Sequence, residues 1–170
     1  MIQTPPSHLP EPLESRRDAD GRLIRLRLAS QVPADLSSRP SWLVALDGSP
    51  HAVRAGAEAL RLAGEMKSCT LHLVHVQHWL SKEAAETELA ARGREASQEA
   101  RRLLDAAGQP WSLHIAMGPS AETIVDIARE LGCRGIVIGC RGLGSASSLL
   151  LGSVTSKVIQ HSPVPVLVVP

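Results

Sequence analysis

Short apolar runs alternate with segments of helical periodicity along most of the chain, from residue 41 to the end. The apolar runs predict strands at residues 42–46, 70–77, 111–117, 135–139 and 164–169. The segments between them predict helices at residues 50–66, 81–107 and 119–131, and a fourth helix that follows Gly152. Runs such as 136–138 are apolar on both faces, which is typical of parallel strands covered by helices on both sides. The sequence therefore predicts a doubly wound α/β domain with a five-stranded parallel sheet.

Residues 1–40 differ in composition from the rest of the chain. They hold six of the twelve prolines, together with a mixture of arginines and acidic residues. The segment 22–28 partly alternates between arginine and an aliphatic residue, a pattern that suits an edge strand with a charged outer face. The alternatives are a solvated extension, which the composition favours, and a basic contact patch. We expect an N-terminal extension at 1–40, partly disordered or forming an added edge strand, and one domain at 41–170.

The composition argues against nucleic acid or a membrane as a partner. Eighteen basic and seventeen acidic side chains leave a net charge of +1, which supplies no broad attractive field. The chain has three Trp and no Phe or Tyr, so it lacks the aromatic platforms on which single-stranded bases stack. No apolar run approaches the ~20 residues that cross a bilayer, and residues 1–12 do not resemble a signal peptide. Three cysteines without C-x-x-C spacing fit reduced thiols, so we expect a cytoplasmic protein.

Three neighbouring histidines, His72, His75 and His78, raise the question of a metal site. On a strand His72 and His78 share one face, about 20 Å apart, while His75 points to the other face, so the three cannot hold one ion. No Ser/His/Asp trio or pair of carboxylates is arranged near the glycine-rich segment described next. We therefore expect no catalytic residues and no direct protein ligands to a metal.

A glycine-rich segment lies between the fourth predicted strand and the last helix. The residues at 139–142, Gly-Cys-Arg-Gly, are followed after nine residues by Gly152-Ser153. Glycine allows the main chain to approach a ligand closely, and the free N–H groups at a helix start attract anions, so this spacing predicts a phosphate cradle. The segment is not the G-x-x-x-x-G-K-[ST] loop, and 142–144 lacks the third glycine of a dinucleotide fingerprint.

The pattern G-x-x-G, nine residues, G-[ST] resembles the nucleotide-binding branch of the universal stress protein family. Further matching segments stand in order at 44–49 (VALDGS), 73–76 (LVHV), 118–120 (GPS), 136–139 (IVIG), 150–155 (LLGSVT) and 163–169 (PVPVLVV). The resemblance covers about residues 41–170. It implies the Rossmann-like fold of the adenine nucleotide alpha hydrolase-like proteins, with the last strand available for pairing with a second copy.

The resemblance also implies that ATP is bound, with its adenine between the first two strands and its phosphates on the glycine loop. The implied adenosine contacts are Ala45, Leu46, Asp47, which would accept a ribose hydroxyl, and Val76, which would flank the base. The implied ribose and phosphate contacts are Ile138, Gly139, Arg141, Gly142, Gly152, Ser153, Val154 and Thr155. Mg²⁺ or Mn²⁺ would be held through the phosphates. From the residues alone, Asp47 can also be an Asx turn that caps the next helix, Arg141 a solvated charge and Gly144 a flexible turn residue.

These expectations combine into one functional hypothesis. ATP orders the loop from Gly139 to Ser153 and so changes a surface that an unknown protein partner reads, while any hydrolysis is slow. The protein is expected to form a homodimer through residues 164–169, because an apolar edge strand is an aggregation risk unless it is paired. The alternatives are a nucleotide-free dimeric scaffold and an enzyme, either a slow ATPase or a nucleotide-dependent transferase.

Overall fold

The computed structural model describes residues 11–30, 39–66, 68–144 and 151–170. Its strands are β1 (Glu14–Arg17), β2 (Leu23–Ala29), β3 (Ser41–Ala45), β4 (Thr70–Gln77), β5 (Trp111–Met117), β6 (Gly135–Gly139) and β7 (Val166–Val169). Its helices are α1 (Pro50–Glu65), α2 (Lys82–Ala106), α3 (Ser120–Glu130) and α4 (Ser153–His161). The elements predicted from residue 41 onward are all present, with boundaries shifted by one or two residues.

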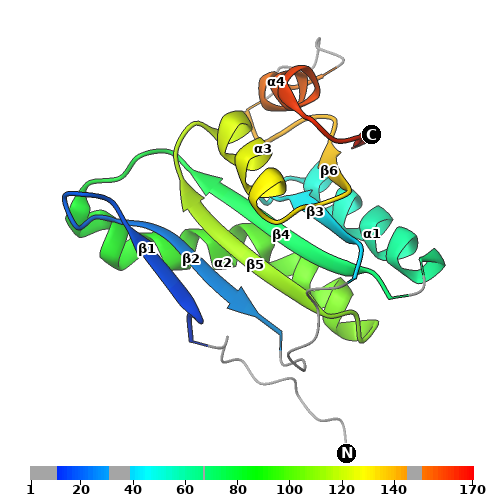
Figure 1. The fold of residues 1–170 in the computed structure, drawn as a ribbon, viewed down its shortest axis with the longest axis horizontal. Helices are drawn as coiled ribbons and strands as arrows, with labels where there is room; N and C mark the ends of the chain where they lie inside the picture. The colour runs from blue at the N-terminus through cyan, green and yellow to red at the C-terminus, as the bar shows by residue number, and fades with distance from the viewer. Residues whose placement is uncertain (1–10, 31–38, 67, 145–150) are drawn as a thin grey trace, which may run out of the picture.

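The strands form one sheet in the order β1-β2-β5-β4-β3-β6-β7 (Figure 1). The five strands from β5 to β7 run parallel, which confirms the predicted doubly wound sheet. The chain proceeds from β3 through β4 to β5 on one side, and β6 and β7 are added on the other side of β3. The strand order therefore reverses between β3 and β6, and ligands in such sheets bind at the carboxyl end of this switch point.

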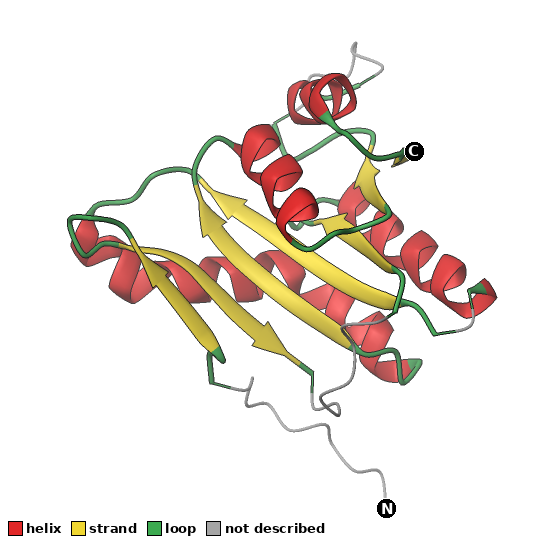
Figure 2. Ribbon diagram, in the orientation of Figure 1, coloured by secondary structure: helices red, strands yellow, loops and turns green. Residues whose placement is uncertain are grey.

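Helices cover both faces of the sheet, as Figure 2 shows. On one face, α1 and α2 pack on side chains such as Leu73, Leu113 and Ile115, all fully buried. On the other face, α3 and α4 pack on residues such as Val74 and Ile136. Neighbouring residues of one strand thus enter different cores, because side chains alternate across a strand. Each fully buried Leu or Ile contributes about 1.5–3 kcal/mol of transfer free energy, so the two cores fix the strand ends that carry the site.

The N-terminal part adds two antiparallel strands to the β5 edge of the sheet. β2 pairs with β5 from Arg25 opposite Ala116 to Ala29 opposite Ser112. Leu28 is fully buried, and β2 joins the core beneath α1 and α2. The segment 22–28, considered above as a strand or as a solvated extension, is therefore a strand, and it is an inner one. The exposed outer strand β1 was not predicted, and the sheet has seven strands instead of five.

The rest of residues 1–40 includes 1–10 and 31–38, which lie outside the described residues. The expected disorder at those positions therefore stays a prediction. No helix in the described part of the chain is long and apolar enough to cross a membrane.

Candidate functional site

A cavity of about 650 Å³ opens at the carboxyl ends of β3, β4 and β6, at the switch point of the sheet. Its volume lies in the range of small-molecule sites. All twelve residues that the sequence assigned to a nucleotide site line this cavity: Ala45, Leu46, Asp47, Val76, Ile138, Gly139, Arg141, Gly142, Gly152, Ser153, Val154 and Thr155. The fold thus brings together residues that are up to 110 positions apart in the chain, from Ala45 to Thr155.

The Asp47 side chain connects the end of β3 to the glycine loop through a hydrogen bond. Its Oδ1 accepts a hydrogen bond from the Ser49 backbone N–H at 2.9 Å, which is the Asx turn considered as an alternative. Its Oδ2 accepts from the Leu143 backbone N–H at 3.2 Å, a contact that the sequence did not suggest. Ser49 itself caps α1 by accepting from the Ala52 backbone N–H at 3.2 Å. A carboxylate offers about four lone-pair positions, so Asp47 keeps acceptor capacity for a ligand hydroxyl.

Two glycines of the loop are required by close contacts. A Cβ on Gly142 would lie 2.5 Å from Asp47 Oδ2, and a Cβ on Gly139 would lie 2.7 Å from the backbone carbonyl carbon of His51. Gly144 differs, because a Cβ there would meet no described atom within 4 Å. The structure therefore gives a steric reason for Gly139 and Gly142 and none for Gly144, which fits its interpretation as a turn residue.

The N-terminus of α4 faces the cavity, and part of its hydrogen-bonding capacity is already used. The Gly152 backbone N–H donates to the Cys140 carbonyl at 2.7 Å, so this amide, which the cradle prediction assigned to a phosphate, is engaged by the protein itself. The first hydrogen bond of the helix runs from the Ser156 N–H to the Gly152 carbonyl at 3.0 Å. The amides of residues 153–155 precede this bond, have no intrahelical acceptor and receive no side-chain cap from Gly152. They carry the partial positive charge of the helix start.

Thr155 and Arg141 complete the phosphate end of the cavity. The Thr155 hydroxyl donates to the Gly139 carbonyl at 2.8 Å, and the side chain is almost completely buried, so it joins α4 to the end of β6. Arg141 is half-buried, and its Nε is buried without a hydrogen-bond partner in the described structure. A guanidinium group in this setting differs from the freely solvated charge considered as an alternative.

The other end of the cavity is more apolar and lies at the ends of β3 and β4. Ala45 and Val76 line it and pack in the core beneath α3 and α4, and Ile138, which precedes Gly139 on β6, also lines the cavity. Behind them, the His75 Nδ1–H donates to the Leu46 carbonyl at 2.9 Å, which fixes the tautomer of this ring. His75 was considered above only as a metal ligand, and its observed partner is a backbone carbonyl.

Sequence reasoning missed several lining residues: Ala52, His75, Gln77, His78, Ser120, Leu143 and Gly144. Gln77 and His78 directly follow Val76 at the end of a predicted strand, and Ser120 belongs to the GPS segment used for the family resemblance. The available signal was therefore the strand end for Gln77 and His78, and the family segment for Ser120.

The fold and the cavity define the class of protein: a doubly wound α/β protein with a small-molecule site at the switch point of its sheet. The sequence profile described as "Universal stress protein family" matches residues 41–170. A universal stress protein of Thermus aquaticus is 35% identical over 132 residues, which cover 75% of this chain and 96% of that protein. The chain belongs to the universal stress protein family.

Solved structures of this family have the same fold. Universal stress protein UspA from Lactobacillus plantarum superposes with a TM-score of 0.67 at 26% identity, over 78% of this chain and 99% of that one. A universal stress protein in complex with cAMP superposes with a TM-score of 0.59 at 25% identity, over 77% of this chain and 97% of that one. The N-terminal hairpin of β1 and β2 precedes the region that the family profile matches, which begins at residue 41.

Proposed function

We propose that this protein is an ATP-binding regulatory protein of the universal stress protein family. The observation that carries the proposal is the single cavity lined by all twelve residues that the sequence assigned to an adenine nucleotide. A structural relative with cAMP bound supports the choice of an adenine nucleotide.

In this proposal the base lies at the apolar end of the cavity, beside Val76, and Asp47 accepts a hydrogen bond from the ribose. The phosphates lie against Gly142 and the first amides of α4, which contribute about 0.3–1 kcal/mol of dipole stabilisation at an exposed site and up to about 2 in a partly buried one. Arg141 adds a planar donor group that suits phosphate oxygens. No group of three or more His, Cys, Asp or Glu side chains that could hold a metal gathers within the described residues. We therefore place Mg²⁺ or Mn²⁺ on the phosphates.

Binding, with hydrolysis slow if it occurs, is the activity that the residues favour. Among the described residues that line the cavity, Asp47 is the only carboxylate, and both its oxygens already accept backbone N–H groups. A general base must lie within hydrogen-bond reach of the attacking water, whereas the remaining acceptor capacity of Asp47 is assigned here to the ribose. We propose that nucleotide occupancy instead orders the loop from Gly139 to Ser153, and that an unidentified protein partner reads the changed surface.

The same proposal includes a homodimer that pairs through residues 164–169 and a cytoplasmic location. The three cysteines are free thiols, which suits a reducing compartment. The apolar strand β7 supports the dimer, because no described strand pairs with its outer side.

Two glycine variants provide the test. Mass spectrometry of freshly purified, denatured protein should detect an adenine nucleotide, and calorimetry should give a saturable heat with ATP and Mg²⁺. In Gly142→Ala the new methyl group collides with Asp47, so we expect the ATP affinity to fall by about tenfold or more. Gly144→Ala, in open space on the same loop, should bind as the wild type does.

No copurified nucleotide and no heat at millimolar ATP would reject the proposal in favour of a nucleotide-free scaffold. Phosphate release that disappears in Gly142→Val would identify a slow ATPase, whereas release unchanged by this substitution comes from a contaminant.

A further inference from the structure

The turn between β1 and β2 is a fixed structure held by its own side chains. Asp18 Oδ1 accepts hydrogen bonds from the backbone N–H groups of Asp20 at 3.1 Å and Arg22 at 2.9 Å. The Gly21 N–H donates to the Asp18 carbonyl at 3.0 Å, and Gly21 has a φ of +76°, a conformation that favours glycine. These hydrogen bonds hold the backbone of residues 18–22 in one conformation.

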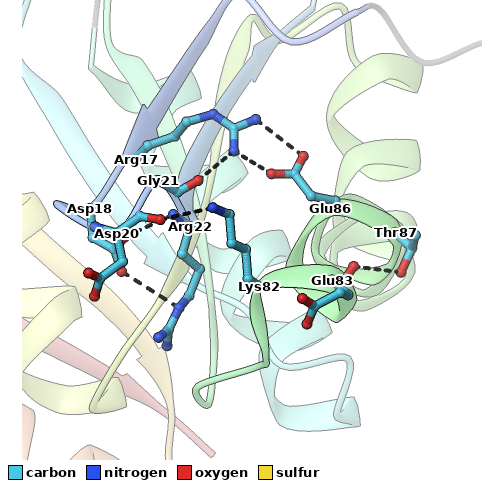
Figure 3. Close-up of polar contacts among 9 residues, drawn as sticks. All are labelled: Arg17, Asp18, Asp20, Gly21, Arg22, Lys82, Glu83, Glu86 and Thr87. Atoms are coloured by element: carbon cyan, nitrogen blue, oxygen red, sulfur yellow. Dashed lines mark hydrogen bonds and ion pairs between the residues drawn. The ribbon is translucent and has the colours of Figure 1, made fainter.

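This turn lies against the start of α2 (Figure 3). Lys82 Nζ donates to the Asp20 carbonyl at 2.9 Å. Arg17 forms an ion pair with Glu86 and also donates to the Gly21 carbonyl at 2.9 Å. Each contact is exposed and weak by itself, but together they hold the turn beside the first turn of the helix.

Arg22 extends this contact to the loop between β4 and α2. Its Nη1 donates to the Leu80 carbonyl at 3.4 Å, and its guanidinium carbon lies 5.7 Å from the centre of the Trp79 ring. A cation at this distance from an indole ring is attracted to it. Trp79 in turn lies beside Gly118, since a Cβ on that glycine would be 3.9 Å from the indole. The Gly118 N–H donates to the Gln77 carbonyl at 3.0 Å, which joins the two loops that follow β4 and β5.

Both loops carry lining residues of the cavity. Gln77 and His78 immediately precede Trp79, and Ser120 follows Gly118 by two residues. We propose that the N-terminal hairpin braces the base end of the nucleotide cavity, with Arg22 as the positioning residue that acts through Trp79. The hairpin precedes the region that the family profile matches, residues 41–170. As far as it concerns ATP, the inference rests on the proposed function.

If the hairpin supports only the base end of the cavity, a change in the hairpin should weaken ligands that carry a base and not ligands that lack one. Arg22 contacts the loop that follows β4 at the base end, whereas the phosphate end is built from Gly142 and α4. Arg22→Ala should therefore lower the affinity for ATP by roughly 2- to 30-fold, the range found for residues that act on a site through their neighbours. It should leave the affinity for inorganic tripolyphosphate, measured by competition, unchanged. Because coupling between sites is reciprocal, ATP should also slow amide hydrogen exchange in residues 17–24 of the wild type.

Two further variants make the result interpretable. Arg22→Lys keeps a cation near the indole and a donor for the Leu80 carbonyl, so its ATP affinity should recover toward that of the wild type. Arg16→Ala removes an arginine of the same hairpin that lies 4.0 Å from Glu130, away from these loops, and should bind ATP normally. A thermal midpoint measured for each variant detects a general loss of stability.

An unchanged ATP affinity in Arg22→Ala, or an equal loss for ATP and tripolyphosphate, would overturn the inference. If the wild type itself binds no ATP, the proposed function fails, and hydrogen exchange in residues 77–81 and 118–120 decides the brace separately. Faster exchange there in Arg22→Ala than in Arg16→Ala supports the brace, and equal exchange rejects it.

Discussion

A buried and a half-buried histidine on neighbouring strands should make the stability of this protein depend steeply on pH. His114 Nε2 lies 3.3 Å from His72 Nδ1, and Arg25 Nη2 lies 3.4 Å from His114 Nδ1. The guanidinium can only donate, so each ring accepts on Nδ1 and carries its proton on Nε2, and both rings are neutral. Burial, with contributions from His72, Arg25 and Arg27, lowers the pKa of His114 to about 3. Burial and Arg27 lower the pKa of His72 to about 4.

These values set the direction and size of the effect. A histidine whose pKa is lower in the folded state stabilises the fold fully above its unfolded pKa of about 6.5, and this contribution is lost as the pH falls toward the folded pKa. Between pH 6.5 and 5 the unfolded chain takes up protons on both residues while the folded protein does not. The free energy of unfolding should then fall by up to about 2.7 kcal/mol per pH unit, or about 4 kcal/mol between pH 7.5 and 5. That is a large part of a typical stability of 5–15 kcal/mol.

Urea unfolding followed by circular dichroism at pH 7.5, 6 and 5 measures this slope directly. The double variant His72→Gln, His114→Gln removes both titrating groups and should flatten most of it. His161→Gln, which changes an exposed histidine in the last turn of α4, should keep the wild-type slope. If the wild type loses no more stability than the double variant over this range, the two rings are not held neutral in the fold, and the reasoning fails.

Four further substitutions test the packing and the site. Gly93→Ala places a methyl group about 2.5 Å from the Ile115 side chain of β5, so the free energy of unfolding in urea should fall by about 1–3 kcal/mol. Gly64→Ala, in open space on α1, should raise it by up to about 1 kcal/mol. Ser49→Ala removes the cap of α1 and should cost about 1 kcal/mol in the same assay. Thr155→Val leaves the Gly139 carbonyl without its donor and should cost about 1–3 kcal/mol, with a weaker calorimetric ATP affinity because α4 is no longer held to β6.

The parallel part of the fold could be predicted because each strand carries a strong local signal. Runs such as 136–138 are apolar on both faces, and Ser49 and Pro50 mark the start of α1. β1, whose sequence is ESRR, has no apolar periodicity at all. It is a strand because its backbone pairs with β2, a long-range interaction that no local pattern records.

Part of the candidate site could likewise be predicted from the sequence, and part could not. The twelve residues implied by the family resemblance line one cavity, because the carboxyl ends of parallel strands meet at one edge of the sheet. The sequence could not show which backbone N–H groups of the site already donate hydrogen bonds within the protein. The Gly152 N–H is bonded to Cys140 and the Leu143 N–H to Asp47, and both bonds depend on how the loop folds back onto β3 and β6.

The two edges of the parallel sheet differ in a way that bears on assembly. At one edge, every residue of β5 is buried, because β2 pairs with it and the charged, exposed β1 ends the sheet. At the other edge, the four residues of β7, Val-Leu-Val-Val, are apolar yet only half-buried, and no described strand pairs with their outer side. A free apolar edge of this kind promotes pairing with another chain. We therefore expect sedimentation equilibrium to give twice the mass of one chain at micromolar concentration, and a single-chain mass under those conditions would refute pairing through β7.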